Sequence, residues 1–174
     1  MDLEFIRTKD KEMPLPTQAS EVTSLRVWFC GFRSLECLRE FSQLKRLVVA
    51  GFPGESLSCL EGLGELEELD IVHFPKVHSL EPLDRLSNLR TLSLATAPSW
   101  DASRKRLRVA SLQPLARLPR LETLTLIGVA PTDRGLLPLL DCERLVSLNL
   151  AGYPAGEKDD ILRIFEAKSE PNAV

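Results

Sequence analysis

The 174-residue sequence has few of the side chains that carry most enzyme chemistry. It contains only two histidines, His73 and His78, which is too few for the common acid–base or metal sites. Its four cysteines form no Cys-x-x-Cys pair, and their spacings of 7, 22 and 83 residues match no usual set of metal ligands. The glycine-containing turn at Gly51–Gly54 is too short to cradle a phosphate. We therefore expect no enzyme activity, no metal and no cofactor.

Long apolar runs and a strong net charge are also missing. No apolar run approaches the roughly 18 residues of a membrane span, and the charged N-terminal stretch lacks the apolar core of a secretory signal. A formal net charge of -3 gives no overall attraction for nucleic acid or for an anionic membrane. Because Cys30, Cys37 and Cys59 fall at positions expected in the interior, we expect free thiols and a cytoplasmic location.

The sequence does contain one short apolar pattern, L-x-x-L-x-L, repeated six times. Its copies are Val22/Leu25/Val27, Leu44/Leu47/Val49, Leu66/Leu69/Ile71, Leu89/Leu92/Leu94, Leu121/Leu124/Leu126 and Leu145/Leu148/Leu150. Subtracting the first position of each copy from the next gives spacings of 22, 22, 23, 32 and 24 residues. A nearly constant period of this length is typical of a solenoid, in which one supersecondary unit per repeat stacks on its neighbours.

Each repeat is predicted to be a strand followed by a short helical return. The alternation at the end of the pattern turns one strand face inward, and apolar residues at a spacing of three then follow, as at Leu80, Leu83 and Leu86. We expect one α/β domain over 1–174, with an N-terminal cap at 1–21, six repeats at 22–156 and a C-terminal capping helix at 157–168. Within the cap, Leu3, Phe5 and Ile6 could form an edge strand.

The repeats resemble those of leucine-rich repeat proteins, specifically the 22-residue class of internalin-like and phosphatase-regulator-like repeats. The segments Ser79–Leu86 and Ser111–Leu118, both S-L-x-P-L-x-x-L, are especially similar to that class, and the resemblance covers about residues 22 to 165. It implies a right-handed solenoid with a parallel sheet on a concave face, which usually binds protein.

One position departs from the family pattern. The third residue after the last core position of each repeat, here called the spine position, is usually Asn or Cys in the family. This chain has Cys30, Phe52, Phe74, Ala97, Val129 and Tyr153 there, and proline directly follows four of them. Since proline ends a strand, we expect the apolar residue before it to pack inward.

Residues between the core positions should face away from the core and form the concave surface. The last strand position carries an apolar column, Trp28, Ala50, Val72, Ala95, Ile127 and Ala151, where solvent would favour polar groups. With its charged neighbours, this column predicts a protein-binding face with Trp28 as the anchor. The candidate binding residues are Arg26, Trp28, Phe29, Arg46, Val48, Asp70, Val72, His73, Trp100 and Ile127. Alternatively, the column has no binding role. The N-terminal segment would then cover Trp28 and Phe29, and the alanines and valine would be present only because they suit a β-strand.

The fourth repeat carries an insertion at 98–109, where Trp100 accompanies Arg104, Lys105, Arg106 and Arg108. One hypothesis is that Trp100 stacks on a base while the cations hold phosphates. We favour a solvated loop that contacts an acidic partner or nothing, because four cations in an acidic chain are a weak nucleic-acid signal. A third possibility is homo-oligomerisation through the apolar face. The predicted function is a non-catalytic adaptor or regulator that binds a protein.

Overall fold

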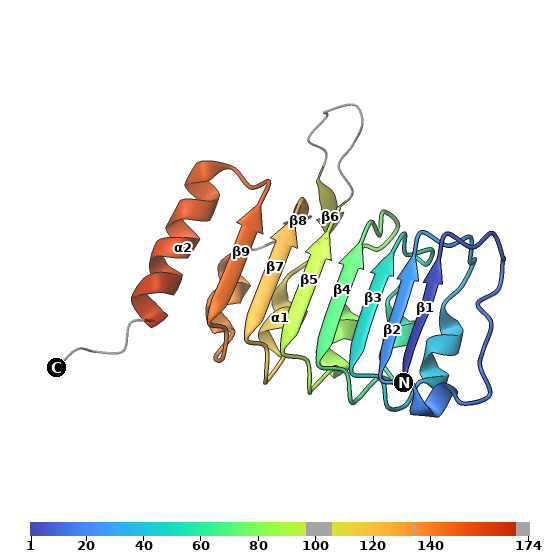
Figure 1. The fold of residues 1–174 in the computed structure, drawn as a ribbon. Helices are drawn as coiled ribbons and strands as arrows, with labels where there is room; N and C mark the ends of the chain where they lie inside the picture. Colours follow the sequence, from blue (N-terminus) through green and yellow to red (C-terminus); the bar gives the residue numbers. More distant parts are fainter. Residues whose placement is uncertain (97–105, 134, 170–174) are drawn as a thin grey trace.

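The computed structural model describes residues 1–96, 106–133 and 135–169 of the chain. Its main sheet contains seven parallel strands in the order β1-β2-β3-β4-β5-β7-β9 (Figure 1). These are β1 (Asp2–Ile6), β2 (Ser24–Trp28), β3 (Arg46–Ala50), β4 (Glu68–Val72), β5 (Thr91–Ala95), β7 (Thr123–Ile127) and β9 (Ser147–Ala151). Neighbours in the sheet follow one another along the chain, so the predicted solenoid is confirmed.

The leucines of successive repeats pair across the sheet. Leu47 lies opposite Leu69, Leu69 opposite Leu92, and Leu92 opposite Leu124. Each of these side chains is at most 1% exposed. The stack is therefore held by a continuous apolar column, in which burial of each leucine contributes roughly 1.5–3 kcal/mol. The strand β1 extends the column by one unit, because Leu3 lies opposite Leu25 and Phe5 opposite Val27.

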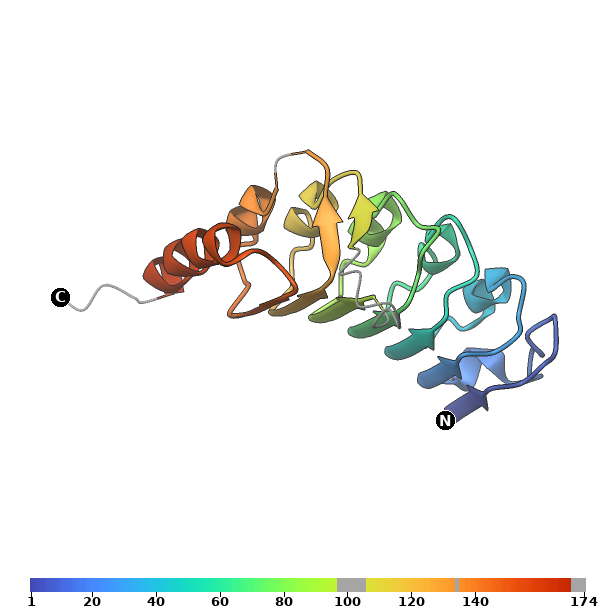
Figure 2. The ribbon, with the colours of Figure 1, turned by 90° about the horizontal axis from the view of Figure 1, so that it is seen from above.

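Short helical segments return the chain from the end of one strand to the start of the next. They are the 3₁₀ segments η1 (Ala19–Glu21), η2 (Glu36–Glu40), η3 (Ser58–Leu60), η4 (Glu81–Arg85) and η5 (Leu137–Asp141), and the short α1 (Gln113–Ala116). Figure 2 shows the strands along the inner side of a shallow arc, with the returns on its outer side. The sheet thus forms the concave face, as the resemblance to leucine-rich repeat proteins implied.

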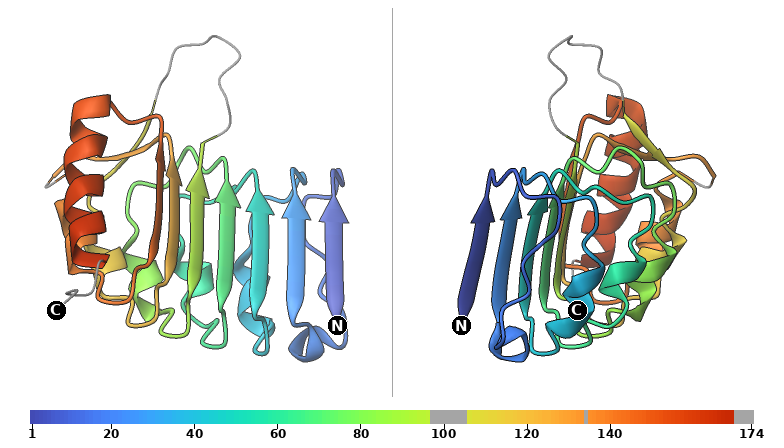
Figure 3. Two further views of the ribbon diagram at one scale, coloured as in Figure 1. Left: turned by 60° about the vertical axis from the view of Figure 1, so that its left-hand side comes forward. Right: turned by 90° about the vertical axis from the view of Figure 1, so that its right-hand side faces the viewer.

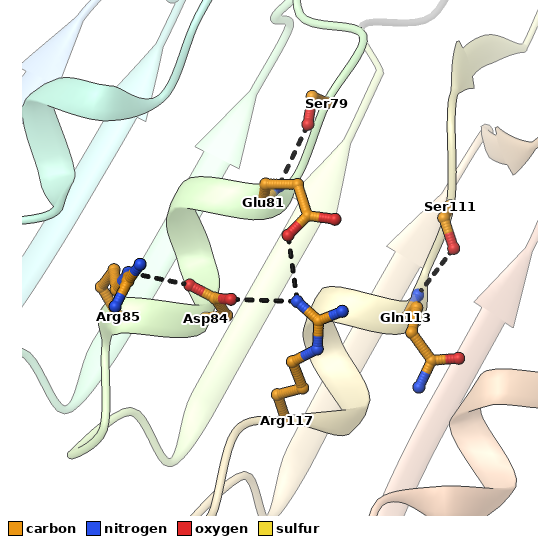
Figure 4. Close-up of polar contacts among 7 residues, drawn as sticks. All are labelled: Ser79, Glu81, Asp84, Arg85, Ser111, Gln113 and Arg117. Atoms are coloured by element: carbon orange, nitrogen blue, oxygen red, sulfur yellow. Dashed lines mark hydrogen bonds and ion pairs between the residues drawn. The ribbon is translucent and has the colours of Figure 1, made fainter.

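A serine opens four of the returns. The hydroxyls of Ser34, Ser56, Ser79 and Ser111 each accept a hydrogen bond of 3.0–3.2 Å from the backbone N–H two residues later. This local bond satisfies a donor at the start of the turn, which explains the S-L-x-x-L pattern. Neighbouring returns are also linked on the outer surface, where Arg117 Nη1 lies 3.1 Å from both Glu81 Oε2 and Asp84 Oδ2 (Figure 4). Such exposed ion pairs add little stability.

The spine position packs inward as expected. Phe52, Phe74, Val129 and Tyr153 are all buried in the core, whereas Cys30 is half-buried and Ala97 lies outside the described residues. The Tyr153 hydroxyl donates a hydrogen bond to the carbonyl oxygen of Val129. Aromatic packing therefore occupies the interior of these bends, where family repeats carry a polar side chain.

Two segments differ from the sequence-based expectation. Part of the predicted insertion loop is strand β6 (Leu107–Val109), which pairs in parallel with β8 (Val129–Pro131) in a separate two-stranded sheet. Helix α2 (Ala155–Ser169) lies beside β9 at the C-terminal end of the stack (Figure 3). Its Ile161 and Phe165 are buried, but Ile164 is 48% exposed, so the apolar face that packs on the core is narrower than its sequence indicated.

Candidate functional site

A shallow hollow lies on the concave face over strands β1 to β4. Its volume is about 540 Å³. Its lining combines acidic, basic and aromatic side chains: Asp2, Glu4, Ser24, Leu25, Arg26, Trp28, Arg46, Val48 and Asp70. Five predicted binding residues therefore come together here, namely Arg26, Trp28, Arg46, Val48 and Asp70.

Trp28 is held at this hollow by its neighbours. The guanidinium carbon of Arg26 lies 4.6 Å from the centroid of the Trp28 ring, a cation–π distance. The same guanidinium is 3.9 Å from Glu4 Oε1. The ring of Phe29 stands edge-on to Trp28 with centroids 5.7 Å apart. These contacts orient the indole before any partner binds.

The alternative in which the N-terminal segment covers Trp28 and Phe29 is wrong, because the segment leaves both rings uncovered. Strand β1 lies beside β2 and pairs Ile6 with Trp28 through the backbone. Phe29 remains 42% exposed and Trp28 half-buried. Because the segment extends the sheet sideways, both rings keep an open surface.

Asp70 is the unusual polar group of the hollow. Its Oδ1 atom is inaccessible to solvent and has no hydrogen-bond partner in the described part of the chain. The nearest strand neighbours in register are Val48 and Ser93, while the nearby Arg46 directs its Nε to Glu68 Oε2 at 3.4 Å. An acceptor left without a donor costs about 1–3 kcal/mol.

The other half of the concave face is polar but uncharged. The first two outward positions on each of β5, β7 and β9 are Thr91, Ser93, Thr123, Thr125, Ser147 and Asn149. Ile127 lies at the end of β7, 38% exposed and three strands from β3. Charge is thus confined to the half of the face that contains Trp28.

The predicted exposed apolar column is interrupted, so that prediction was wrong in part. Ala50 is fully buried and Ala95 is 9% exposed, whereas Trp28 and Val72 on either side of Ala50 are half-buried. The larger neighbours cover the small methyl group. The column presents separate apolar points, not a stripe.

The residue after six of the seven strands of the main sheet adopts an unusual backbone conformation, and Thr96 after β5 is the exception. Positive φ angles occur at Arg7 (51°), Phe29 (47°), Gly51 (77°), His73 (62°), Gly128 (67°) and Gly152 (80°). The N–H of such a residue continues the sheet ladder, as where His73 donates to the carbonyl of Ala95 at 2.8 Å. His73 and Phe29 therefore hold turn positions that favour glycine, at a cost in strain.

The other side chains considered for chemistry are dispersed. His78 lies between β4 and η4, where its Nδ1 is 3.4 Å from the carbonyl oxygen of Arg108. Over the described ranges, no group of three or more His, Cys, Asp or Glu is arranged to hold a metal ion. None of the helices in this part of the chain has the length and apolar character needed to cross a membrane.

The four cysteines form no disulfide in the part of the chain that the structure describes, but they are not equally buried. Cys59 and Cys142 are buried, whereas Cys30 and Cys37 are half-buried, so the expectation that both of these lie inside was wrong. Burial, assisted by the charge of Glu36, raises the pKa of the Cys59 thiol to about 12. The pKa of Cys37 is also raised, mainly by burial. Neither thiol is activated as a nucleophile.

The insertion is only partly described. Trp100, Arg104 and Lys105 lie outside the described residues. The guanidinium carbon of Arg106 lies 5.6 Å from the centroid of the Tyr153 ring, and Arg108 is exposed on β6.

Comparisons with known proteins agree with this geometry. A family model described as R13L1/DRL21 LRRs matches residues 31–97. The chain has the fold of a leucine-rich repeat solenoid. No curated protein matches it by sequence. Its fold is similar to that of an internalin, inlF, from Listeria monocytogenes, with a TM-score of 0.59 and 20% identity over 74% of this chain and 34% of the internalin chain.

A second internalin structure gives the same result for the fold. Internalin C2 (inlC2) of Listeria monocytogenes has a TM-score of 0.56 and 22% identity over 75% of this chain and 52% of that chain. The leucine-rich repeat chain described here thus spans between a third and about half of the length of these internalin chains.

The sequence-based map of the concave face omitted Asp2 and Glu4. Both line the hollow, and they were assigned to a cap because the repeat pattern before Leu3 is incomplete. A signal was nevertheless present: Leu3 and Phe5 precede Leu25 and Val27 by 22 residues, the period of the next repeats.

Proposed function

We propose that this leucine-rich repeat protein is a non-catalytic binding module that holds a protein partner on the charged half of its concave face. The observation that carries the proposal is the hollow over β1 to β4, which places the half-exposed Trp28 near the unsatisfied carboxylate oxygen of Asp70. An aromatic anchor beside charged groups is a frequent composition of the energetically dominant part of a protein interface. As in our sequence-based hypothesis, the module acts as an adaptor or regulator in the cytoplasm.

The rigidity of the face supports this role. Each strand of the hollow is hydrogen-bonded into the sheet, and Trp28 is already oriented by Arg26 and Phe29. A partner that docks on a preorganised surface loses less conformational entropy than one that must order a loop. The carboxylate of Asp70 favours a partner that inserts a hydrogen-bond donor, such as a lysine, an arginine or an amide.

The test compares variants of two opposite surfaces in affinity capture from the native lysate. The double variant Trp28→Ala/Val72→Ala alters the concave face, and Arg117→Ala alters the outer surface as a matched control. We expect the captured partner to be retained by the wild type and by Arg117→Ala and lost from the double variant. Equal capture by all three proteins would contradict the proposal.

The captured partner should then be purified and its affinity measured by calorimetry. Asp70→Asn keeps the size of the side chain and removes its charge, so we expect at least about tenfold weaker binding if a cation pairs with Asp70. Circular dichroism melts of every variant must match that of the wild type for the comparison to hold.

A further inference from the structure

The two edge strands of the main sheet differ in what packs beside them. At the C-terminal end, α2 lies beside β9 and buries Ile161 and Phe165 in the core. At the other end, β1 is the outermost strand and pairs only with β2 among the described strands. The view from this end shows no other segment crossing β1 (Figure 3). An open strand edge of this kind is a template for pairing with another chain.

The backbone of β1 presents a defined set of free groups at this edge. The carbonyl of Met1 accepts a hydrogen bond from Thr23 N–H, and Arg7 N–H donates to the Trp28 carbonyl, so the odd-numbered residues face β2. Backbone groups of successive strand residues point to alternate sides. The N–H and C=O groups of Asp2, Glu4 and Ile6 therefore point to the open edge.

The side chains of β1 differ on its two faces. Leu3 and Phe5 point toward the core but are only half-buried, whereas their register partners Leu25 and Val27 are buried. Asp2 and Glu4 are exposed on the concave side, and among the described residues their one ion pair is the 3.9 Å contact of Glu4 with Arg26. The edge thus offers incomplete apolar packing on one face and unbalanced negative charge on the other.

We propose that β1 accepts an additional strand from a partner polypeptide in which basic and apolar residues alternate. Its backbone would bond to the free groups of Asp2, Glu4 and Ile6. Its apolar side chains would complete the packing over Leu3 and Phe5, and its lysines or arginines would lie opposite Asp2 and Glu4. This is strand addition, in which the backbone supplies affinity and alternate side chains supply specificity. The proposal concerns the backbone edge of β1, although the side chains of Asp2 and Glu4 also line the concave hollow.

A second copy of the same chain fits this edge less well. The antiparallel pairing that uses all five residues of β1 places Glu4 opposite Glu4 of the other copy. Like charges directly opposite each other destabilise a strand pair. The acidic residues thus act against self-pairing and in favour of a basic strand.

The test uses a short synthetic peptide that alternates lysine and valine, with two control peptides. One control has the same composition with the lysines grouped at one end, and the other alternates glutamate and valine. Fluorescence anisotropy with the full chain measures affinity, and amide hydrogen exchange followed by NMR measures protection of individual N–H groups. We expect the alternating basic peptide to bind and to protect the amides of Glu4 and Ile6, and neither control to do so.

Glu4 also lines the concave hollow, so the exchange measurement and Asp70→Asn separate binding at the edge from binding in the hollow. Glu4→Pro removes one outward N–H, a substitution that edge strands tolerate, and should abolish binding. Glu4→Lys keeps the backbone intact and should weaken binding at least about tenfold, while Asp70→Asn should leave it unchanged. If Glu4→Pro fails to fold, Glu4→Lys and the hydrogen-exchange measurement still test whether the peptide binds at the edge of β1. The proposal would be overturned if the peptide bound without protecting the amides of Glu4 and Ile6, or if the grouped peptide bound equally well. It would also be overturned if Asp70→Asn abolished peptide binding, or if these amides became protected without peptide as the protein concentration rose.

Discussion

A Cβ atom added to Gly128 would overlap the Oγ1 atom of Thr96 in the neighbouring turn. Gly128 also has a φ of 67°, a conformation that costs an L-residue roughly 1–2 kcal/mol. The close approach and the left-handed backbone both require glycine at this position.

Gly128→Ala should therefore destabilise the protein by about 2–4 kcal/mol, which combines the conformational strain with overpacking. Chemical denaturation measures the loss. The double variant Gly128→Ala/Thr96→Ala removes the oxygen and should recover only the overpacking part. If the single variant were as stable as the wild type, the turn would have to adopt a different geometry.

Truncation in the leucine column should be costly. Leu69→Ala or Leu92→Ala should lower the free energy of unfolding by about 2–5 kcal/mol, because each leucine is at most 1% exposed and truncation leaves a cavity. Ser93→Ala, on the outward side of the same strand as Leu92, is the matched control and should change stability by less than about 0.5 kcal/mol. A melting shift of only about a degree for the leucine variants would be incompatible with the repeat stack.

His73 stands where three other turns carry glycine, with a φ of 62°. His73→Gly should stabilise the fold by about 0.5–1 kcal/mol, because relief of roughly 1–2 kcal/mol of strain exceeds the greater freedom of glycine in the unfolded chain. Val72→Gly, one residue earlier in the extended strand, should destabilise it. Urea unfolding of both variants provides the comparison, and a loss of stability in His73→Gly would show that the imidazole makes a compensating contact.

The thiol of Cys59 predicts a dependence of stability on alkaline pH. Its pKa is raised from 9.0 to about 12, first by burial and then by the charge of Glu36. Above pH 9 the unfolded chain loses this proton while the folded chain keeps it, so the free energy of unfolding falls as the pH rises from about 9 toward 12. Below pH 9 the thiol contributes no pH dependence.

Urea unfolding at several pH values between about 8 and about 11 measures this effect. Cys59→Ala should make the decline less steep than in the wild type, whereas Cys30→Ala provides a control at a half-buried thiol. Identical slopes for the wild type and Cys59→Ala would mean that the Cys59 thiol ionises in the folded protein as it does in the unfolded chain.

Much of the fold follows from the spacing of leucines in the sequence. A residue such as Leu92 can be buried only if Leu69 and Leu124 lie beside it, so the repeat period fixes the register of the strands. The three-residue strands β6 and β8 could not be predicted in this way, since neither contains a periodic pattern. They form because the chain after the insertion passes beside the bend after β7.

The candidate site was less predictable than the fold. The sequence places Arg26, Trp28 and Asp70 on one face, because outward positions alternate with the core positions. It does not show that Asp70 Oδ1 lacks a donor among the described residues, or that the nearby Arg46 lies 3.4 Å from Glu68. The exposure of Phe29 likewise depends on where the N-terminal segment lies.

The regular register of the sheet also determines how the chain can fold. Every pairing joins residues only 22 to 32 positions apart, such as Asp2 with Ser24 and Thr91 with Thr123. The longest of these loops costs only about 0.3 kcal/mol more closure entropy than the shortest. No step requires the two ends of the chain to meet, so ordering can begin at any adjacent pair of turns and spread outward in both directions.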